Sequence, residues 1–147
     1  MDTPIKIRRA IAEDYSPITK LTNQLGYPST EKKVKEILNM VLTHDDHEIF
    51  VATADENVVG YIHLVCTMRL GSEPFIEIAA IIVDEDYRSR GVGHALLDRT
   101  QEYAESMGYS VIRIRSNIVR EPAHKFFTEQ GYVNLKTQEV FMKELMK

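Results

Sequence analysis

The most constraining feature of the chain is the passage from an apolar segment, 75–83, through a charged turn into a helix that opens with glycines. The segment is apolar at nearly every position, which predicts a strand buried on both faces of a sheet. Gly91 and Gly93 have no Cβ, so the backbone there can approach a ligand closely. The first N–H groups of a helix have no partner within it, and its dipole favours an anion. The passage therefore predicts a phosphate- or pyrophosphate-binding turn, with Arg88 and Arg90 beside it.

Hydrophobic periodicity predicts the other elements. They are a strand at 5–8, helices at 12–25 and 31–42, strands at 48–53, 58–68 and 75–83, a helix between the glycines at 91 and 108, a strand at 111–114, a helix from 122 to before 131, and two strands within 132–145. The strands at 48–53 and 58–68 should form an antiparallel hairpin. This order predicts an α/β fold with a mixed, mostly antiparallel central sheet of about six to seven strands and helices on both faces.

The composition bounds the domain count and the class of partner. The chain has 147 residues, 44% hydrophobic and 27% charged, so we expect a single domain over 1–147. Its formal charge of -4 argues against a general nucleic-acid binder, which carries a basic excess. No signal-peptide pattern or membrane-length apolar run is present, and the lone Cys66 fits a reducing compartment. We expect a cytoplasmic protein with no nucleic-acid, membrane or metal partner, and a homodimer is compatible with the sequence.

Two common phosphate-binding motifs do not fit the glycine pair. The dinucleotide fingerprint requires a third glycine after Gly93, and the Walker loop requires glycine-lysine followed by serine or threonine; neither occurs at this turn. The remaining pattern is Arg88-x-x-Gly91-x-Gly93, followed by Ala95. It resembles the signature (Gln or Arg)-x-x-Gly-x-(Gly or Ala) of the GNAT superfamily of acetyl-CoA-dependent N-acetyltransferases.

A second motif extends the resemblance over most of the chain. The run from Ser116-Asn117 to Phe126-Phe127, then Gly131-Tyr132, is similar to the second acetyl-CoA motif of that family. The resemblance implies that the strand backbone binds the pantetheine arm, that the turn amides bind the pyrophosphate, and that the asparagine lies near the thioester. The implied acetyl-CoA site consists of Ile81, Ile82, Val83, Arg88, Ser89, Arg90, Gly91, Val92, Gly93, His94, Ala95, Asn117 and Phe127. For the two arginines, solvated turn charges are the alternative.

Glu77 is the predicted catalytic residue. A carboxylate within an apolar strand is costly to bury unless it is paired or opens on a cleft. An attacking amine is protonated near neutral pH, and a carboxylate can accept its proton directly or through water. The position of Glu77 before the signature also resembles that of the general-base glutamate in histone-acetylating and several small-molecule GNAT enzymes. The alternative is an outward-facing or salt-bridged strand glutamate.

The chain departs from the family at the general acid. Many members have a tyrosine at the fourth position after the alanine of the second motif, where it can protonate the leaving thiolate, but this chain has Phe127. A phenyl ring donates no proton, so that role falls to water, to another residue or to none. Tyr132, which matches the aromatic residue after Gly131, is more often a core residue in the family.

Four residues are candidates for the acceptor site. Tyr27 lies in the loop between the first two helices, which borders the acceptor cleft in this superfamily, and His63 lies on the predicted hairpin. An exposed turn aromatic and a plain sheet histidine are the alternatives. Arg120 and His124 could meet an anionic part of the acceptor or coenzyme. The spacing within the second motif resembles that of the aminoalkylphosphonate and aminoglycoside-type branches, which acetylate small amines.

The sequence therefore predicts an N-acetyltransferase that moves an acetyl group from acetyl-CoA to a primary amine of a small molecule by direct attack. Two alternatives stay open. One is a catalytically silent acyl-CoA-binding or sensory module, which the phenylalanine at the acid position favours. The other is an enzyme that acetylates protein N-termini or lysines.

Overall fold

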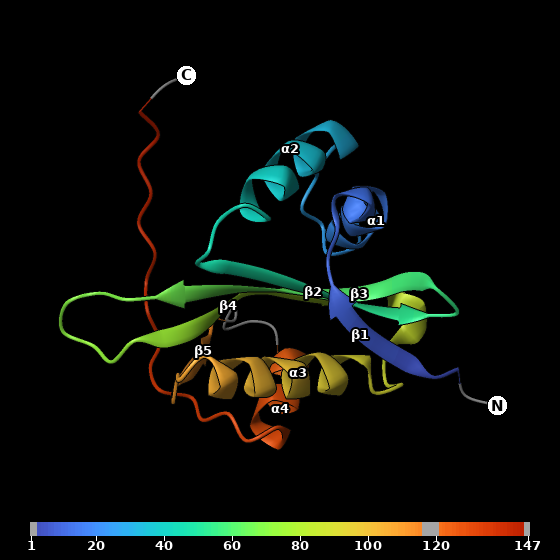
Figure 1. The fold of residues 1–147 in the computed structure, drawn as a ribbon. Helices are drawn as coiled ribbons and strands as arrows, with labels where there is room; N and C mark the ends of the chain where they lie inside the picture. Colours follow the sequence, from blue (N-terminus) through green and yellow to red (C-terminus); the bar gives the residue numbers. More distant parts are fainter. Residues whose placement is uncertain (1–2, 116–120, 146–147) are drawn as a thin grey trace. The chain divides into compact units, whose positions relative to one another are not determined.

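The larger unit of the chain is built on a five-stranded sheet whose strands lie in sequence order (Figure 1). The computed structural model describes residues 3–115 and 121–145, which belong to two units, Met1–Arg115 and Ser116–Lys147. The strands are β1 (Ile5–Arg9), β2 (His47–Ala54), β3 (Asn57–Thr67), β4 (Phe75–Val83) and β5 (Ile112–Ile114). β1 to β4 pair antiparallel, and β5 pairs parallel to β4. The mixed, mostly antiparallel sheet and the 48–68 hairpin are confirmed.

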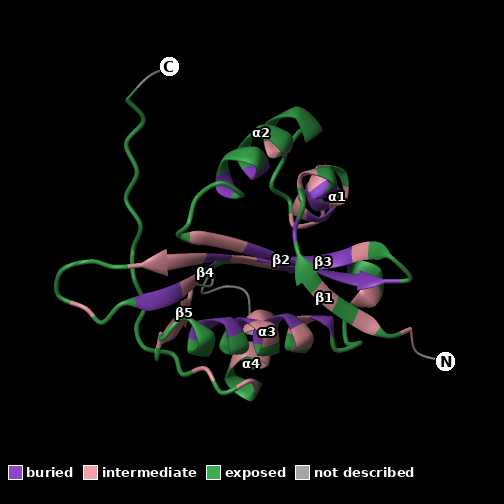
Figure 2. Cartoon of the chain, viewed as in Figure 1, coloured by how far each residue is buried: buried purple, intermediate pink, exposed green. Residues whose placement is uncertain are grey.

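Helices cover both faces of this sheet, as expected. The helices of this unit are η1 (Ala12–Asp14), α1 (Tyr15–Gln24), α2 (Glu31–Val41), η2 (Glu85–Tyr87) and α3 (Val92–Ser106). The second unit contains α4 (Glu121–Glu129). α1 and α2 lie on one face, and α3 lies on the other (Figure 1). The buried residues of these three helices face the sheet, while their outer surfaces are exposed (Figure 2). In the described part of the chain, no helix combines the length and the apolar character needed to span a bilayer.

The two faces of the sheet are packed by different side chains. On the α1/α2 face, Leu21 and Leu38 belong to a buried cluster with Val51, Tyr61 and Ile82 of the strands. On the α3 face, the rings of Phe50 and Tyr103 meet edge to face with centroids 5.8 Å apart. This separation of the faces matters for the site, because a strand side chain on one face cannot reach groups on the other.

Local signals set the ends of the first two helices. α1 ends before Gly26, whose φ of +88° is the left-handed value that favours glycine at a helix C-terminus. α2 begins after Thr30, whose hydroxyl accepts a hydrogen bond from the Lys33 N–H at 3.2 Å. The helix expected at 12–25 starts instead as a 3₁₀ turn. There the buried Asp14 carboxylate accepts the Ile11 N–H at 2.8 Å and contacts Arg8 at 2.9 Å.

The expectation of six to seven strands is wrong, because the described residues form five. The two missing strands were expected within 132–145, where the structure has no strand. Apolar side chains in this segment remain in solvent; Val133, Val140 and Phe141 are 87%, 84% and 88% exposed. Alternating apolar residues favour a strand only where a neighbouring strand and a core cover them, and the local pattern does not supply either.

Candidate active site

The candidate coenzyme side of the site begins at the point along β4 where its pairing with β5 ends. β5 pairs only with Ile76–Ile78 of β4. In the part of the chain that the structure describes, no strand pairs with residues 79–83 on that edge. Ala79 is exposed and Ile81 is half-buried, while Ile82 is buried under α1 and α2. The backbone of this half-strand therefore offers the hydrogen-bonding edge that an extended pantetheine arm needs, so the implied residues Ile81, Ile82 and Val83 fit acetyl-CoA.

The turn between β4 and α3 has the backbone geometry of an anion site. Ser89 and Gly91 both have positive φ, +63° and +85°, and Gly91 is the residue before the first turn of α3. This left-handed conformation directs successive N–H groups toward one side, as in anion-binding nests. The Glu85 N–H donates to the Gln24 side chain at 3.0 Å, which ties the turn to the end of α1. The turn thus has the backbone conformation expected of an anion site.

The side chains of the turn contribute less than its backbone. Arg88 is exposed, and the Arg90 guanidinium lies over the Tyr87 ring, 5.2 Å from its centroid. His94 Nε2 lies 3.1 Å from the Asp98 carboxylate on the next turn of α3. Val92 is buried against β3, where a Cβ on Gly60 would lie 3.0 Å from its Cγ1. Of the predicted residues here, Val92 has a packing role, and the others surround the helix start with Gly93 and Ala95.

A β-bulge sets the face on which Glu77 lies. In the β3–β4 pairing His63 is opposite Ala80 and Leu64 is opposite Ile78, so Ala79 is an extra residue. Residues opposite each other across a strand pair point to the same face. Because Ala80 packs on the cluster under α1 and α2, His63 faces that side. Glu77 is opposite Val65, two residues from His63 on β3, and therefore lies on the α1/α2 face as well.

The Glu77 carboxylate is partly accessible and loosely paired. Its side chain is 23% exposed, and its Oε2 lies 3.8 Å from Nε of Arg115, whose own side chain is 63% exposed. Such a long, solvated contact is a weak ion pair. Glu77 therefore has features of both predicted alternatives. It has an arginine partner, as a salt-bridged strand glutamate would, and its carboxylate stays accessible on the strand whose edge at 79–83 β5 leaves unpaired.

Three arginines lie at this end of β4, at Glu77 or at the neighbouring Phe75, and the sequence analysis did not predict them as site residues. Arg69, which follows β3, and Arg113 of β5 both lie over the Phe75 ring, with their guanidinium carbons 5.1 and 4.5 Å from its centroid. Arg113 is opposite Glu77 in the β4–β5 pairing. We name Arg69, Arg113 and Arg115 the arginine cluster. The spacing of two between Arg113 and Arg115 was the available signal, since it places both on one face of a strand.

His63 lies in a histidine pair on the same face. Its Nε2 is 2.8 Å from Nδ1 of His47, so one ring donates and the other accepts. The half-buried position and the neighbouring His47 lower the pKa of His63 to about 4. His63 is therefore a neutral imidazole at physiological pH. The hairpin pattern predicted the strand, but no local signal identified His47 as the partner.

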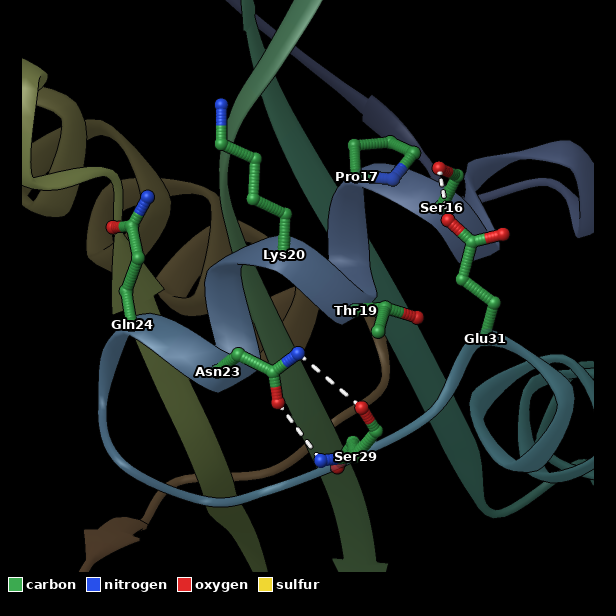
Figure 3. A pocket seen from close by; sticks show the side chains of 8 residues that line it. All are labelled: Ser16, Pro17, Thr19, Lys20, Asn23, Gln24, Ser29 and Glu31. Carbon is green, nitrogen blue, oxygen red and sulfur yellow. Dashed lines mark hydrogen bonds between the residues drawn. The ribbon is translucent and has the colours of Figure 1, made fainter.

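An open cavity of about 770 Å³ lies along α1 and the loop that follows it (Figure 3). Its lining includes Lys20 and two hydrogen-bonded pairs of polar residues. Ser16 donates to Glu31 at 2.8 Å, and Asn23 accepts the Ser29 N–H at 2.8 Å. None of the sequence-predicted site residues lines it. Tyr27 lies in the adjoining loop and is 58% exposed, which agrees with the alternative of an exposed turn aromatic. The cavity is thus part of the α1–α2 connection.

The remaining predicted residues lie in the second unit or outside the description. Asn117 and Arg120 lie outside the described residues. Phe127 of α4 packs between the rings of Phe126 and Tyr132, at centroid distances of 5.6 and 6.2 Å. Burial raises the pKa of Tyr132, so its phenol stays protonated near neutral pH. His124 is half-buried on α4, where its carbonyl accepts a hydrogen bond from the Thr128 hydroxyl.

Comparisons with known proteins agree with this geometry. An uncharacterized N-acetyltransferase of Methanocaldococcus jannaschii is 25% identical over 108 residues, which cover 72% of this chain and 48% of that protein. The aminoalkylphosphonate N-acetyltransferase of Salmonella typhimurium is 31% identical over 83 residues, covering 56% of this chain and 54% of that protein. The chain thus spans about half the length of these curated relatives.

A solved structure shares the fold. It is that of AAC(6')-Iy in complex with a bisubstrate analog of CoA and acetylneamine, with a TM-score of 0.85 at 18% identity, covering 97% of this chain and 99% of that one. The model of the acetyltransferase (GNAT) family matches residues 8–132, a range that includes β4, the anion-binding turn and α3. The chain belongs to the GNAT family of acetyltransferases, whose acetyl donor is acetyl-CoA.

Proposed function

We propose that this protein is an N-acetyltransferase that transfers the acetyl group of acetyl-CoA to a primary amine of a small molecule, with Glu77 as the general base. The family supplies the donor. The similarity to the Salmonella aminoalkylphosphonate N-acetyltransferase supports a small amine over a protein acceptor. The location and partners of the whole protein are part of the same proposal: a cytoplasmic enzyme that needs no metal.

The observation that carries the proposal is the position of the Glu77 carboxylate. It is a half-buried carboxylate in the otherwise apolar β4, just before the residues whose outer edge β5 leaves open. A group placed there can reach an amine that approaches from the α1/α2 face while the thioester lies along the strand edge. A positioned base close to the reacting nitrogen typically accelerates proton-coupled steps by about 10²–10⁴-fold.

In the proposed step, an ammonium group first loses a proton to Glu77, directly or through a water. The nitrogen lone pair then forms a bond to the thioester carbonyl carbon. The carbon–sulfur bond breaks when the tetrahedral intermediate collapses, and coenzyme A leaves as a thiolate. The nitrogen, which still carries one proton more than the amide, releases that proton to water. Free coenzyme A takes up a proton from water, which suits a chain with Phe127 at the position of the usual acid. The products are an acetamide and the thiol.

The proposal is tested by measuring thiol release from acetyl-CoA across a panel of small amines, with wild type and Glu77→Gln. We expect the variant to lose roughly 10²–10⁴-fold in rate near pH 7 and to recover part of it at higher pH, where the amine is already deprotonated. Glu48→Gln is the matched control, because Glu48 is also a partly buried strand glutamate with an arginine partner, Arg9 at 3.1 Å. Equal rates for wild type and Glu77→Gln would sink the assignment of the base.

Phe127 favours a second candidate, a silent acyl-CoA-binding module. A chain that has lost its acid could keep the coenzyme site and lose turnover. Calorimetry separates the two: acetyl-CoA binding without thiol release on any amine would favour the silent module. Thiol release that depends on Glu77 would exclude it.

A further inference from the structure

We propose that the arginine cluster binds an acidic group on the acceptor, so that the amine this enzyme acetylates also carries a carboxylate or a phosphonate. The inference rests on the proposed function, because it assigns the substrate class of the same site. It is carried by the charges and contacts of Arg69, Arg113 and Arg115, which lie in the loop after β3, in β5 and directly after β5.

The cluster has an excess of positive charge. Its three guanidinium groups have one recorded carboxylate partner, Glu77, which lies 3.8 Å from Arg115. Within residues 3–115, no carboxylate lies at ion-pair distance from Arg69 or Arg113. The chain as a whole has a formal charge of -4, so this local excess runs against its overall composition. Like charges held close together repel, and a bound oxyanion would remove that cost.

The Phe75 ring orients two of the guanidinium groups. The ring is only 1% exposed, and both Arg69 and Arg113 lie against it within 5.1 Å of its centroid. A guanidinium stacked on a ring keeps its N–H edge free for other partners. Two such edges beside one ring match the paired oxygens of a carboxylate or phosphonate, which arginine binds in a bidentate manner.

The position of the cluster also constrains the length of the acceptor. Arg113 is opposite Glu77 on the neighbouring strand, and adjacent strands lie about 4.8 Å apart. An acceptor with about two or three carbon atoms between its nitrogen and its acidic group spans that distance. Its acid would also compete with Glu77 for Arg115, which would leave the Glu77 carboxylate available to the amine.

The test compares amines that differ in the acidic group: 2-aminoethylphosphonate, β-alanine and the neutral propylamine. Wild type should show a higher kcat/KM for the two acids than for propylamine. Arg113→Gln and Arg69→Gln should each reduce that preference roughly 10- to 100-fold, mainly through KM of the acid, and leave KM for acetyl-CoA unchanged. Arg113→Lys keeps the charge but not the bidentate fork, so its preference for acids should lie between those of wild type and Arg113→Gln.

Arg99→Gln is the matched control. The Arg99 guanidinium also stacks on a phenylalanine, 4.5 Å from the Phe50 centroid, but it lies on the α3 face. This variant should keep the preference for acids. Arg69 is exposed, so its substitution tests the cluster without disturbing the core if Arg113→Gln fails to fold. Equal kcat/KM for acids and propylamine in wild type would overturn the inference.

A binding measurement distinguishes failure of this inference from failure of the proposed function. Calorimetry with β-alanine and 2-aminoethylphosphonate needs no turnover. If no amine supports thiol release but an acid binds wild type and not Arg113→Gln, the proposed function fails and the acid site stands. If neither acid binds and no amine reacts, both fail.

Discussion

The neutral state of His63 gives a quantitative prediction for stability. The pKa of this histidine falls from the ordinary 6.5 to about 4 in the folded protein. Between pH 7 and pH 5 the unfolded chain therefore takes up a proton that the folded chain does not. Linkage then predicts that this group lowers the free energy of unfolding by about 2 kcal/mol over that range. Water reaches part of the ring, so this is an upper value.

The sign follows from the direction of the pKa shift. A folded pKa below the unfolded one stabilises the fold above pH 6.5, and that contribution is lost as the pH falls toward 4. The groups that face His63 are His47, at hydrogen-bond distance on β2, and Glu77, a diagonal neighbour on β4; His44 touches His47 in turn. Comparison of wild type with a single-site variant cancels contributions from groups that the substitution leaves unaltered.

The assay is urea unfolding of wild type and His63→Gln at pH 7, 6 and 5. Glutamine keeps a hydrogen-bonding group near the position of Nε2 but does not titrate in this range. Wild type should lose up to about 2 kcal/mol more than the variant between pH 7 and pH 5. His44→Gln, at an exposed histidine, controls for removal of an imidazole from the surface. If wild type and His63→Gln lose the same amount, His63 is not held neutral by the fold and the reasoning fails.

Two further predictions concern the glycines that position α3. Gly60→Ala places a Cβ 3.0 Å from Val92 Cγ1 and 3.1 Å from the Ile82 carbonyl, so denaturation should show a loss of about 1–3 kcal/mol; an unchanged midpoint would mean that β3 and α3 are not in close contact. Gly91→Ala must adopt a φ of +85°, so it should lose roughly 1–2 kcal/mol, with acetyl-CoA affinity falling in calorimetry. Gly91→Asn should recover part of the stability, because asparagine tolerates this conformation, and equal losses for both variants would contradict the backbone explanation.

The helices and strands that local sequence patterns specify could be predicted from the sequence. The strand at 75–83 has the expected bounds, and α2 begins directly after its capping residue Thr30, because burial on both faces and a capping hydroxyl leave local signals. The prediction of two strands within 132–145 was wrong for the opposite reason, because a strand needs a pairing edge that no local pattern specifies. His47 and His63 come from different strands, and Glu77 lies on a different strand from Arg113, so only the register of the sheet brings these residues together.

The bulge at Ala79 shows most clearly what the sequence could not decide about the site. In a regular strand Glu77 would share a face with Ala79, Ile81 and Val83. The extra residue reverses that relation: Ile81, opposite Ile62, faces α3, whereas Ala80 and Ile82 join Glu77 on the α1/α2 face. One inserted residue thus gives β4 two different roles along its length. Its first half presents the Glu77 carboxylate on the face of the histidine pair, and its second half presents a backbone edge that β5 leaves unpaired, next to the turn before α3. If the proposed function is correct, the bulge lets an acceptor and a thioester approach the same strand from different directions.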